Sequence, residues 1–329
     1  MQNFVRRLSA RCLLLYLPIV AVITFQGAIR LSSREIRLEA YAFFFNELCW
    51  LAVPYALVAF AFSVNAVRAR TWTTAIVTFA AGMLACAGLY ARFIEPERIV
   101  VRESRINVGA PLRVALMSDL HIGMFQGRAR TEQIVDRLNR LNVDVVLVAG
   151  DWTYEPTRPL AELLAPLAKS RHRIFSVPGN HDEELPGPPL AAELRAALLA
   201  NRVEPIEGRV VTVKGIRFVG VGDRWAHKDY VPQIADERSP LAALAHNPDS
   251  LDRLAGTAIG TLLAGHTHGG QVNLPLATRW VLKSATKQNF KRGLYRRGDR
   301  QIFVTSGLGM TGLPLRLFQP PVIDVITFQ

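Results

Sequence analysis

Residues 112–121 read LRVALMSDLH, an apolar run suited to a buried strand that ends in an aspartate and a histidine. The same pattern occurs three more times, in VVLVAGD at 145–151, FSVPGN at 175–180 and LLAGH at 262–266. Each run is followed directly by a side chain that can bind a metal ion. In α/β sheets, ligands bind in the crevice beyond the carboxyl ends of the strands. The four runs therefore predict one polar site at such an edge.

The sequence around these runs predicts an α/β domain over residues 111–329. Apolar residues have helical spacing over 131–141, between strands expected at 112–118 and 143–148, which gives strand, helix, strand. The further expected elements are a strand at 173–177, a helix at 189–200, a hairpin of 210–213 with 216–221, and strands at 260–264, 301–305 and 322–328.

The first hundred residues contain three long apolar segments, at 12–29, 48–67 and 71–91. Each is long enough for a helix of roughly 20 residues to cross a bilayer. An apolar fraction of 50% and a mean hydropathy of +0.18 are also high for a soluble enzyme. We therefore expect an α-helical transmembrane region over 1–98 and a linker at 99–110. A cleaved secretory signal is the alternative for the first segment, and a buried helical hairpin for the other two.

The chain has a net charge of +12, and the basic excess is spread over both halves. An anionic membrane surface or an anionic substrate explains this excess with fewer assumptions than nucleic acid, which is not expected as a partner. All three cysteines fall in the apolar segments, and no disulfide framework is implied. One basic group is either a solvated face or a contact for lipid headgroups or anionic substrate: Lys283, Lys287, Lys291, Arg292, Arg296 and Arg297.

The polar residues after the strands suit a pair of divalent cations, because carboxylate, amide and imidazole ligands accept hard-to-borderline metals. Two cations a few ångströms apart need a shared anion to offset their repulsion. Asp151 is the candidate for this bridging carboxylate, since Gly150 lets the backbone approach closely there. The alternative is a set of capping and turn residues, which Asp and Asn often provide after strands.

Five blocks of sequence carry these residues: Asp119-Leu120-His121, Gly150-Asp151, Gly179-Asn180-His181-Asp182, His246-Asn247-Pro248-Asp249 and Gly265-His266-Thr267-His268-Gly269-Gly270-Gln271. In order, they resemble the motif blocks of the calcineurin-like metallophosphoesterases. The resemblance covers about residues 111–329 and implies a four-layer α/β/β/α sandwich with two mixed sheets between helices. The apolar N-terminal region and the extension Gly269-Gly270-Gln271 look more like a membrane-anchored subgroup, which includes hydrolases of UDP-2,3-diacylglucosamine.

The resemblance implies a role for each of these residues. One metal ion would be held by Asp119, His121, Asp151 and His268, and the second by Asp151, Asn180, His246 and His266. Together the ions would activate a water for in-line attack on phosphorus. His181 is implied as the catalytic residue that contacts the phosphoryl group or protonates the leaving oxygen, and Asp182 could orient its imidazole. Mn²⁺ is favoured, although Fe²⁺, Zn²⁺, Co²⁺ and Ni²⁺ accept the same ligands.

Other features carry less weight. Trp152 stands close to where many members of the family carry an acidic or amide residue, and it could shape the substrate cleft. The glycines of 307–312 spell a dinucleotide-binding pattern, but no second strand and helix can follow, so a loop packed beside the metal crevice is expected. His172 and His227 lie outside the blocks and are expected to be solvated or core residues, although His227 could touch substrate from a loop.

These features predict a membrane-anchored phosphoesterase that hydrolyses a phosphodiester or pyrophosphate bond. UDP-2,3-diacylglucosamine in lipid A synthesis is the leading substrate, and another lipid-linked or nucleotide phosphoester is the alternative. A catalytically silent membrane sensor is the alternative from a different class. Positive charges that flank the apolar segments slightly favour a catalytic domain on the cytoplasmic face of a bacterial-type inner membrane, although those before the first helix favour the opposite. The oligomeric state is left open.

Overall fold

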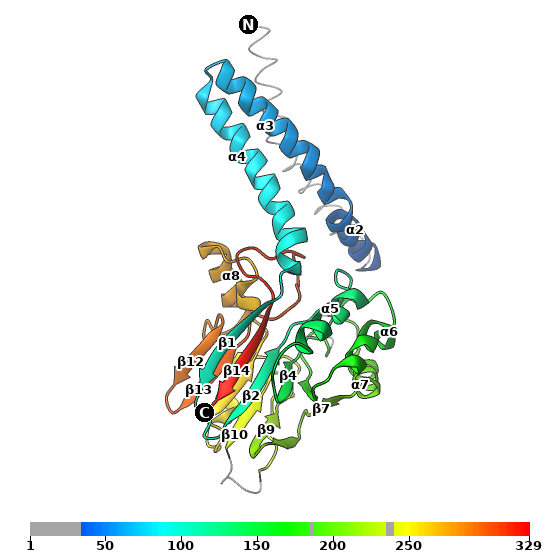
Figure 1. The fold of residues 1–329 in the computed structure, drawn as a ribbon, viewed down its shortest axis with the longest axis vertical. Coiled ribbons are helices and arrows are strands. Elements are labelled where there is room, and N and C mark those ends of the chain that lie inside the picture. Colours follow the sequence, from blue (N-terminus) through cyan, green and yellow to red (C-terminus); the bar gives the residue numbers. More distant parts are fainter. Residues whose placement is uncertain (1–33, 184–186, 235–239) are drawn as a thin grey trace. The chain divides into compact units, whose positions relative to one another are not determined.

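The computed structural model describes residues 34–183, 187–234 and 240–329. The chain divides into two compact units, Met1–Arg92 and Phe93–Gln329 (Figure 1). The first segment expected to be a transmembrane helix, 12–29, lies outside the described residues. The second and third expected segments fall in the first unit.

The first unit is built from helices, which are α2 (Arg34–Asn46), the 3₁₀ helix η1 (Leu48–Leu51), α3 (Ala52–Arg68) and α4 (Trp72–Leu89). A π-helical turn, η2 (Tyr90–Ile94), follows α4. Two stretches, Ile36–Arg68 with 33 residues and Trp72–Glu97 with 26, are long and apolar enough to cross a membrane. The expected segment 48–67 therefore continues a helix that begins upstream.

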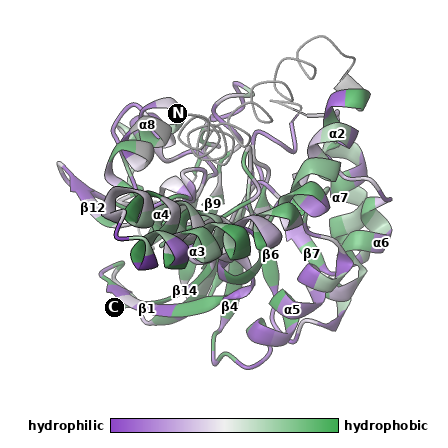
Figure 2. Ribbon diagram, turned by 90° about the horizontal axis from the view of Figure 1, so that it is seen from above, coloured by the Kyte–Doolittle hydropathy of each residue, from purple (hydrophilic) through white to green (hydrophobic). Residues whose placement is uncertain are grey.

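Helices α3 and α4 pack against each other through small side chains. Ala59 and Ser63 of α3 and Ala75 of α4 are buried, and the Ser63 hydroxyl donates to the Ala75 carbonyl at 2.8 Å. A Cβ on Gly82 would lie 2.6 Å from the ring of Phe60. Large apolar side chains point outwards instead, and Figure 2 shows hydrophobic residues along both helices. Helices that pack within lipid have this arrangement.

The second unit contains two six-stranded mixed sheets, with strand orders β1-β14-β2-β4-β6-β7 and β12-β13-β11-β10-β9-β8. Neighbours are parallel except β14 with β2, β12 with β13, and β8 with β9. The first sheet consists of β1 (Val100–Ile106), β2 (Leu112–Met117), β4 (Val145–Ala149), β6 (Ile174–Val177), β7 (Val203–Pro205) and β14 (Val322–Phe328). The second consists of β8 (Val210–Val213), β9 (Ile216–Gly220), β10 (Leu241–Leu244), β11 (Thr261–Ala264), β12 (Gly293–Arg297) and β13 (Arg300–Val304).

Three apolar cores hold the layers together. The outer face of the first sheet packs against α5 (Arg128–Leu138), α6 (Leu160–Leu164) and α7 (Ala191–Ala200). A second core lies between the two sheets. The third core, on the other face of the second sheet, is closed by the 3₁₀ helix η5 (Pro248–Leu254) and by Phe290. Among the described residues, the connection between β10 and β11 contains the 3₁₀ helix η5 and no α-helix, unlike the helical layer that the resemblance implies.

The remaining elements are short, apart from α8 (Pro275–Ala285). A two-stranded sheet joins β3 (Ile122–Gly123) to β5 (Thr153–Tyr154). The remaining 3₁₀ helices are η3 (Glu95–Glu97), η4 (Ala165–Lys169) and η6 (His268–Gly270).

The structure contains elements that were not expected from the sequence, among them β7, β12 and α8, and it differs from the expectations at three further places. Residues 99–110, expected as a linker, contain β1, which pairs in parallel with β14. β1 is the outermost strand of its sheet, so one of its edges has no neighbouring strand. Edge strands often carry polar residues, and the polar sequence of β1 lacks the apolar run that would have predicted a strand. Strand β10 was not expected, since its sequence LAAL lacks β-branched residues. The helix expected at 131–141 is α5, which starts three residues earlier.

Leu147 tests the core between the sheets, where its side chain is fully buried on β4. We expect Leu147→Ala to lower the free energy of unfolding by about 2–5 kcal/mol, because it removes apolar contacts and leaves a cavity. Leu199→Ala, on an exposed position of α7, should lower it by less than about 1 kcal/mol. Denaturant unfolding of both purified variants measures the difference, and equal losses would contradict the assigned core.

Candidate metal centre

Five loops bring the seven expected ligands together. They follow β2, β4 and β6 of the first sheet and β10 and β11 of the second. All seven side chains are buried: Asp119, His121, Asp151, Asn180, His246, His266 and His268. The cluster lies where the carboxyl ends of strands from both sheets meet, which is the edge at which α/β proteins build their sites.

Asp119, His121 and His268 place three ligand atoms close together. Nε2 of His268 is 3.1 Å from Nε2 of His121 and 3.4 Å from Oδ1 of Asp119. Oδ2 of Asp151 is 3.5 Å from Nε2 of His121. Two carboxylates and two imidazoles at these separations can surround one divalent cation.

A second group forms around His246. Its Nε2 atom is 3.2 Å from Oδ2 of Asp151, 3.1 Å from Nδ1 of His266 and 3.1 Å from Oδ1 of Asn180. Oδ2 of Asp151 therefore faces both groups. Oδ1 of Asp151 accepts a hydrogen bond from the backbone N–H of His181 at 2.9 Å. Asp151 occupies the position that a carboxylate shared between two cations requires.

The backbone contacts of two histidines determine which ring nitrogen is available to a metal ion. Nδ1 of His121 lies 3.2 Å from the carbonyl oxygen of Thr153, and Nδ1 of His246 lies 2.7 Å from that of Ala149. A carbonyl only accepts, so each Nδ1 carries a proton and each Nε2 is left to bind a metal or a proton. Oδ1 of Asp119 has no hydrogen-bond partner among the described residues. This donor set fits divalent cations.

Five of the ligand residues have a left-handed backbone conformation, with φ between 48° and 70°: Asp119, His121, Asp151, His266 and His268. Such conformations cost about 1–3 kcal/mol each in residues other than glycine, and they persist only when surrounding contacts enforce them. Gly150 has φ of 80°, and a Cβ there would lie 2.7 Å from the backbone nitrogen of Gly179. The two ligand loops can approach this closely only because glycine occupies position 150.

Backbone hydrogen bonds hold the loops after β2 and β4 side by side. The N–H of Asp119 donates to the Gly150 carbonyl at 2.9 Å, and that of His121 donates to the Asp151 carbonyl at 3.1 Å. The pairing of β3 with β5 continues this contact beyond the ligands. The left-handed backbone of these ligand residues is therefore held in place by hydrogen bonds between the two loops and by the strand pairing that follows them.

Burial and charge set the protonation of the metal-free cluster. Burial lowers the pKa of His121 and of His266 to about 3, so both imidazoles are neutral near pH 7. Burial raises the pKa of Asp119 to about 6. Burial also acts to lower the pKa of His246, but the Asp151 carboxylate outweighs it and raises this pKa to about 10. Without a metal ion, His246 therefore holds a proton against Asp151.

His181 lies at the side of the cluster and is only partly buried. Its ring centroid is 5.0 Å from that of His121 and 5.3 Å from that of Tyr154. Its Nε2 atom lies 3.2 Å from the hydroxyl oxygen of Thr311. His181 can also be grouped with His121 and Asp151, since their ligand atoms lie within 4.8 Å of one another. The imidazole is thus placed beside the candidate ligands and is partly exposed to solvent.

Asp182 does not orient the His181 imidazole, contrary to expectation. Its buried carboxylate accepts hydrogen bonds from the backbone N–H groups of Trp152, Thr153 and Gly179 at 3.2, 3.1 and 3.0 Å. It also accepts from the Thr153 hydroxyl at 3.0 Å. Asp182 therefore ties the loop after β4 to the loop after β6.

Trp152 does not shape a substrate cleft, because its side chain is fully buried and its Nε1–H donates to the Ser176 hydroxyl at 2.6 Å. Trp225 lies against the ligands instead. Its ring centroid is 4.6 Å from that of His266, and its side chain is exposed. The sequence pattern carries no signal for Trp225, and His227, two residues further along the chain, is exposed.

The glycine-containing loop 307–312 packs beside the metal cluster, as expected. The N–H of Leu308 donates to the Ser118 carbonyl at 3.0 Å. Gly307 has φ of 68°, and a Cβ there would lie 2.7 Å from the Cβ of Asp119. The loop thus supports the first ligand and also supplies Thr311 to His181.

Arg316 stabilises this loop through hydrogen bonds to backbone carbonyl groups. Its fully buried guanidinium donates to the carbonyls of Gly309, Ser306 and Gln319 at 2.8, 3.0 and 3.1 Å. The buried carboxylate of Glu95 accepts from the backbone N–H of Gln319 at 2.5 Å and from that of the residue before it at 2.9 Å. One cation and one anion therefore satisfy the polar backbone of the loop.

His172 has a structural role. Its Nε2 atom lies 3.1 Å from the carbonyl oxygen of Leu138 at the end of α5, and this contact involves none of the candidate ligands. This agrees with the expectation that His172 does not belong to the site.

Comparison with known proteins gives consistent matches. Residues 112–270 match the model of a family described as calcineurin-like phosphoesterase. An uncharacterized metallophosphoesterase of Helicobacter pylori (strain J99) is 34% identical over 227 residues, which cover 64% of this chain and 58% of the relative. Phosphodiesterase YaeI of Escherichia coli (strain K12) is 28% identical over 213 residues, or 61% and 76% of the two chains. A transmembrane protein with metallophosphoesterase domain of Danio rerio is 29% identical over 225 residues, or 63% and 50%.

These matches cover only parts of the relatives. The matched region spans 58% of the length of the Helicobacter pylori relatives and half of the Danio rerio relative. The similarity therefore concerns the second unit and its ligand blocks most directly.

Binding of metal to this cluster should release protons. His246 is protonated near pH 7 in the metal-free protein, and Asp119 is partly so near pH 6, whereas a metal ion needs both groups without their protons. The apparent affinity for Mn²⁺ should therefore rise between pH 6 and 8, about tenfold per pH unit for each proton released. Calorimetric titration in two buffers of different ionisation enthalpy measures the proton count. A count of zero would contradict the assigned protonation.

Proposed function

We propose that this chain is a metal-dependent hydrolase of phosphodiester or pyrophosphate bonds, because residues 112–270 match the model of the calcineurin-like phosphoesterase family and one relative is described as a phosphodiesterase. The observation that carries the proposal is the pair of ligand groups on either side of Asp151, with ligand atoms within 4.8 Å of one another in each. The first proposed ion has the ligands Asp119, His121, Asp151 and His268. The second has the ligands Asp151, Asn180, His246 and His266.

When bound, two divalent ions supply Lewis acidity and lower the pKa of water, and Mn²⁺ is the ion we favour. The ligand set also accepts Fe²⁺, Zn²⁺, Co²⁺ and Ni²⁺. The protein contributes rigidity, because strained backbone and paired loops hold the ligand side chains in place.

His181 is the proposed catalytic residue. It is the partly exposed histidine of the cluster, and its Nε2 atom can give a proton to the leaving oxygen of a phosphoester bound beside it. The Thr311 hydroxyl, 3.2 Å from that nitrogen, restricts the rotation of the ring. The exposed ring of Trp225, beside His266, offers a flat apolar surface to the part of the substrate that does not react.

We further propose that the chain is anchored in a membrane. The stretches Ile36–Arg68 and Trp72–Glu97 have the necessary length and composition, and only 17% and 22% of their apolar windows are buried. Core helices of soluble proteins are mostly buried, and the small-residue contact between α3 and α4 fits a lipid environment. A relative described as a transmembrane protein supports the same proposal.

The membrane anchor makes a lipid-linked phosphoester the favoured substrate class, with UDP-2,3-diacylglucosamine as one candidate within it. A substrate that contains a nucleotide would require the domain to face the cytoplasm from the inner membrane. A topology reporter fused after Gln329 tests this orientation, and we expect its signal to place the fusion point in the cytoplasm. A signal from the opposite side of the membrane would remove nucleotide-linked lipids from the candidate substrates.

His181→Ala tests the catalytic proposal. With Mn²⁺ and an aryl phosphodiester or UDP-2,3-diacylglucosamine as substrates, we expect kcat to fall by about 10²–10³-fold, because the leaving oxygen loses its proton donor. Metal content, measured by elemental analysis, should stay at the wild-type level. His172→Ala, which changes a histidine outside the cluster, should keep full activity.

Three outcomes separate the alternatives. Loss of metal in His181→Ala would make His181 a ligand. Full activity in that variant would remove its catalytic role. A wild-type protein that binds two Mn²⁺ ions and hydrolyses no phosphoester in a broad panel would be a sensing or binding protein instead.

A further inference from the structure

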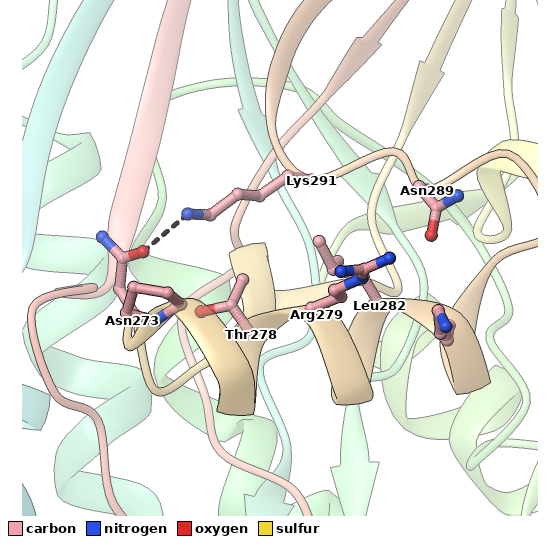
Figure 3. A pocket seen from close by; sticks show the side chains of 8 residues that line it. Asn273, Thr278, Arg279, Leu282, Asn289 and Lys291 are labelled. Atoms are coloured by element: carbon pink, nitrogen blue, oxygen red, sulfur yellow. Dashed lines mark hydrogen bonds between the residues drawn. The ribbon is translucent and has the colours of Figure 1, made fainter.

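A pocket of about 490 Å³ lies beside α8, and none of the proposed metal ligands lines it (Figure 3). Its polar lining comes from the helix and from two flanking segments: Asn273, Thr278, Arg279, Lys283, Asn289 and Lys291. Figure 3 shows Arg279 on the helix and both Asn289 and Lys291 on the segment that faces it. The pocket therefore is a second candidate binding site, separate from the metal cluster.

The charged groups of the pocket are all cations. Arg279, Lys283 and Lys291 line it, and no carboxylate does. Lys291 Nζ donates to Oδ1 of Asn273 at 2.6 Å, and within the described ranges none of the three cations forms an ion pair. Three cations without counter-charges favour an anionic ligand, and phosphate is the anion best matched to arginine and lysine together.

Exposed apolar side chains lie next to these cations. Leu276, in the first turn of α8, is 85% exposed, and Leu274 just before the helix is also exposed. The neighbouring loop presents Phe318, which is 63% exposed. Asn273 joins the two segments, since its side-chain amide donates to the Phe318 carbonyl at 3.2 Å. Apolar side chains this exposed mark a surface that binds another partner.

We propose that the α8 pocket binds the phosphate headgroup of an anionic phospholipid, with Leu274, Leu276 and Phe318 in the apolar edge of the lipid layer. Charge complementarity selects this occupant, because basic residues beside exposed apolar residues on one helix match an anionic lipid surface on both counts. A free phosphate would use the cations and leave the apolar side chains in water. The inference does not depend on hydrolysis at the metal cluster.

The pocket also adjoins the loop that carries His266 and His268. The Thr267 hydroxyl donates to the Lys291 carbonyl at 2.6 Å. A Cβ on Gly270 would lie 2.7 Å from a methyl group of Thr278, so the loop and α8 are in direct contact. A lipid bound at α8 would therefore contact residues that pack directly against the loop carrying His266 and His268.

Hydrogen exchange of the full chain in a non-ionic detergent tests the proposal. With added phosphatidylglycerol, the amides of 274–285 should exchange at least about fivefold more slowly, and phosphatidylcholine with the same acyl chains should have no such effect. The double variant Arg279→Gln/Lys283→Gln should lose the slowing. The matched control Arg296→Gln/Arg297→Gln removes the same charge from exposed positions of β12 and should keep it.

Each other outcome overturns the proposal. If phosphatidylcholine slows amide exchange in α8 as much as phosphatidylglycerol does, α8 has no specific headgroup site. The same conclusion follows if both double variants lose the slowing equally. Slowing by inorganic phosphate alone, at the same concentration, would make the pocket a phosphate site without lipid contact. Because all four substituted residues line the exposed surface, circular dichroism is expected to be unchanged.

Discussion

The contacts of the Asp151 carboxylate are the interactions on which the candidate metal centre depends. One of its oxygens faces His121 and His246, and the other is fixed by the backbone of His181. The first of these histidines follows a strand of the first sheet and the second follows a strand of the other. A buried negative charge in this position is tolerated only while cations or protons surround it. The two sheets are therefore joined at this edge by electrostatics and along their faces by apolar packing.

The residue types and their places after strands could be predicted from the sequence, because both are local properties. Asp119 and Asp151 follow strands whose apolar runs are unmistakable. Trp225 could not be predicted, since it reaches the cluster from a loop with no distinctive spacing. The glycine pattern of 307–312 predicted a loop beside the cluster, but it did not single out Thr311 as the residue that contacts His181. The strand β10 before His246 was missed because alanine and leucine do not distinguish a buried strand from a helix.

The wrong roles for Asp182 and Trp152 have a common cause. Adjacency in the sequence suggests that residues next to a ligand or catalytic group act on it, but the chain has a left-handed conformation at Asp151, and Trp152 and Thr153 after it are both buried. Trp152 is consequently turned into the core, and Asp182 satisfies the backbone of that same turn. Both residues support the candidate ligand loops by packing and hydrogen bonding, and neither is placed to contact a substrate.

The pairing of β1 with β14 has a consequence for how the protein is made. β14 lies between β1 and β2, so the first sheet has a vacant position until residues 322–328 leave the ribosome. The apolar helices of the first unit are synthesised long before that point, while this sheet still lacks one of its inner strands. Loops 266–268 and 307–312 also emerge after most of the first sheet. The complete candidate metal centre can therefore form only after all of these segments have been synthesised.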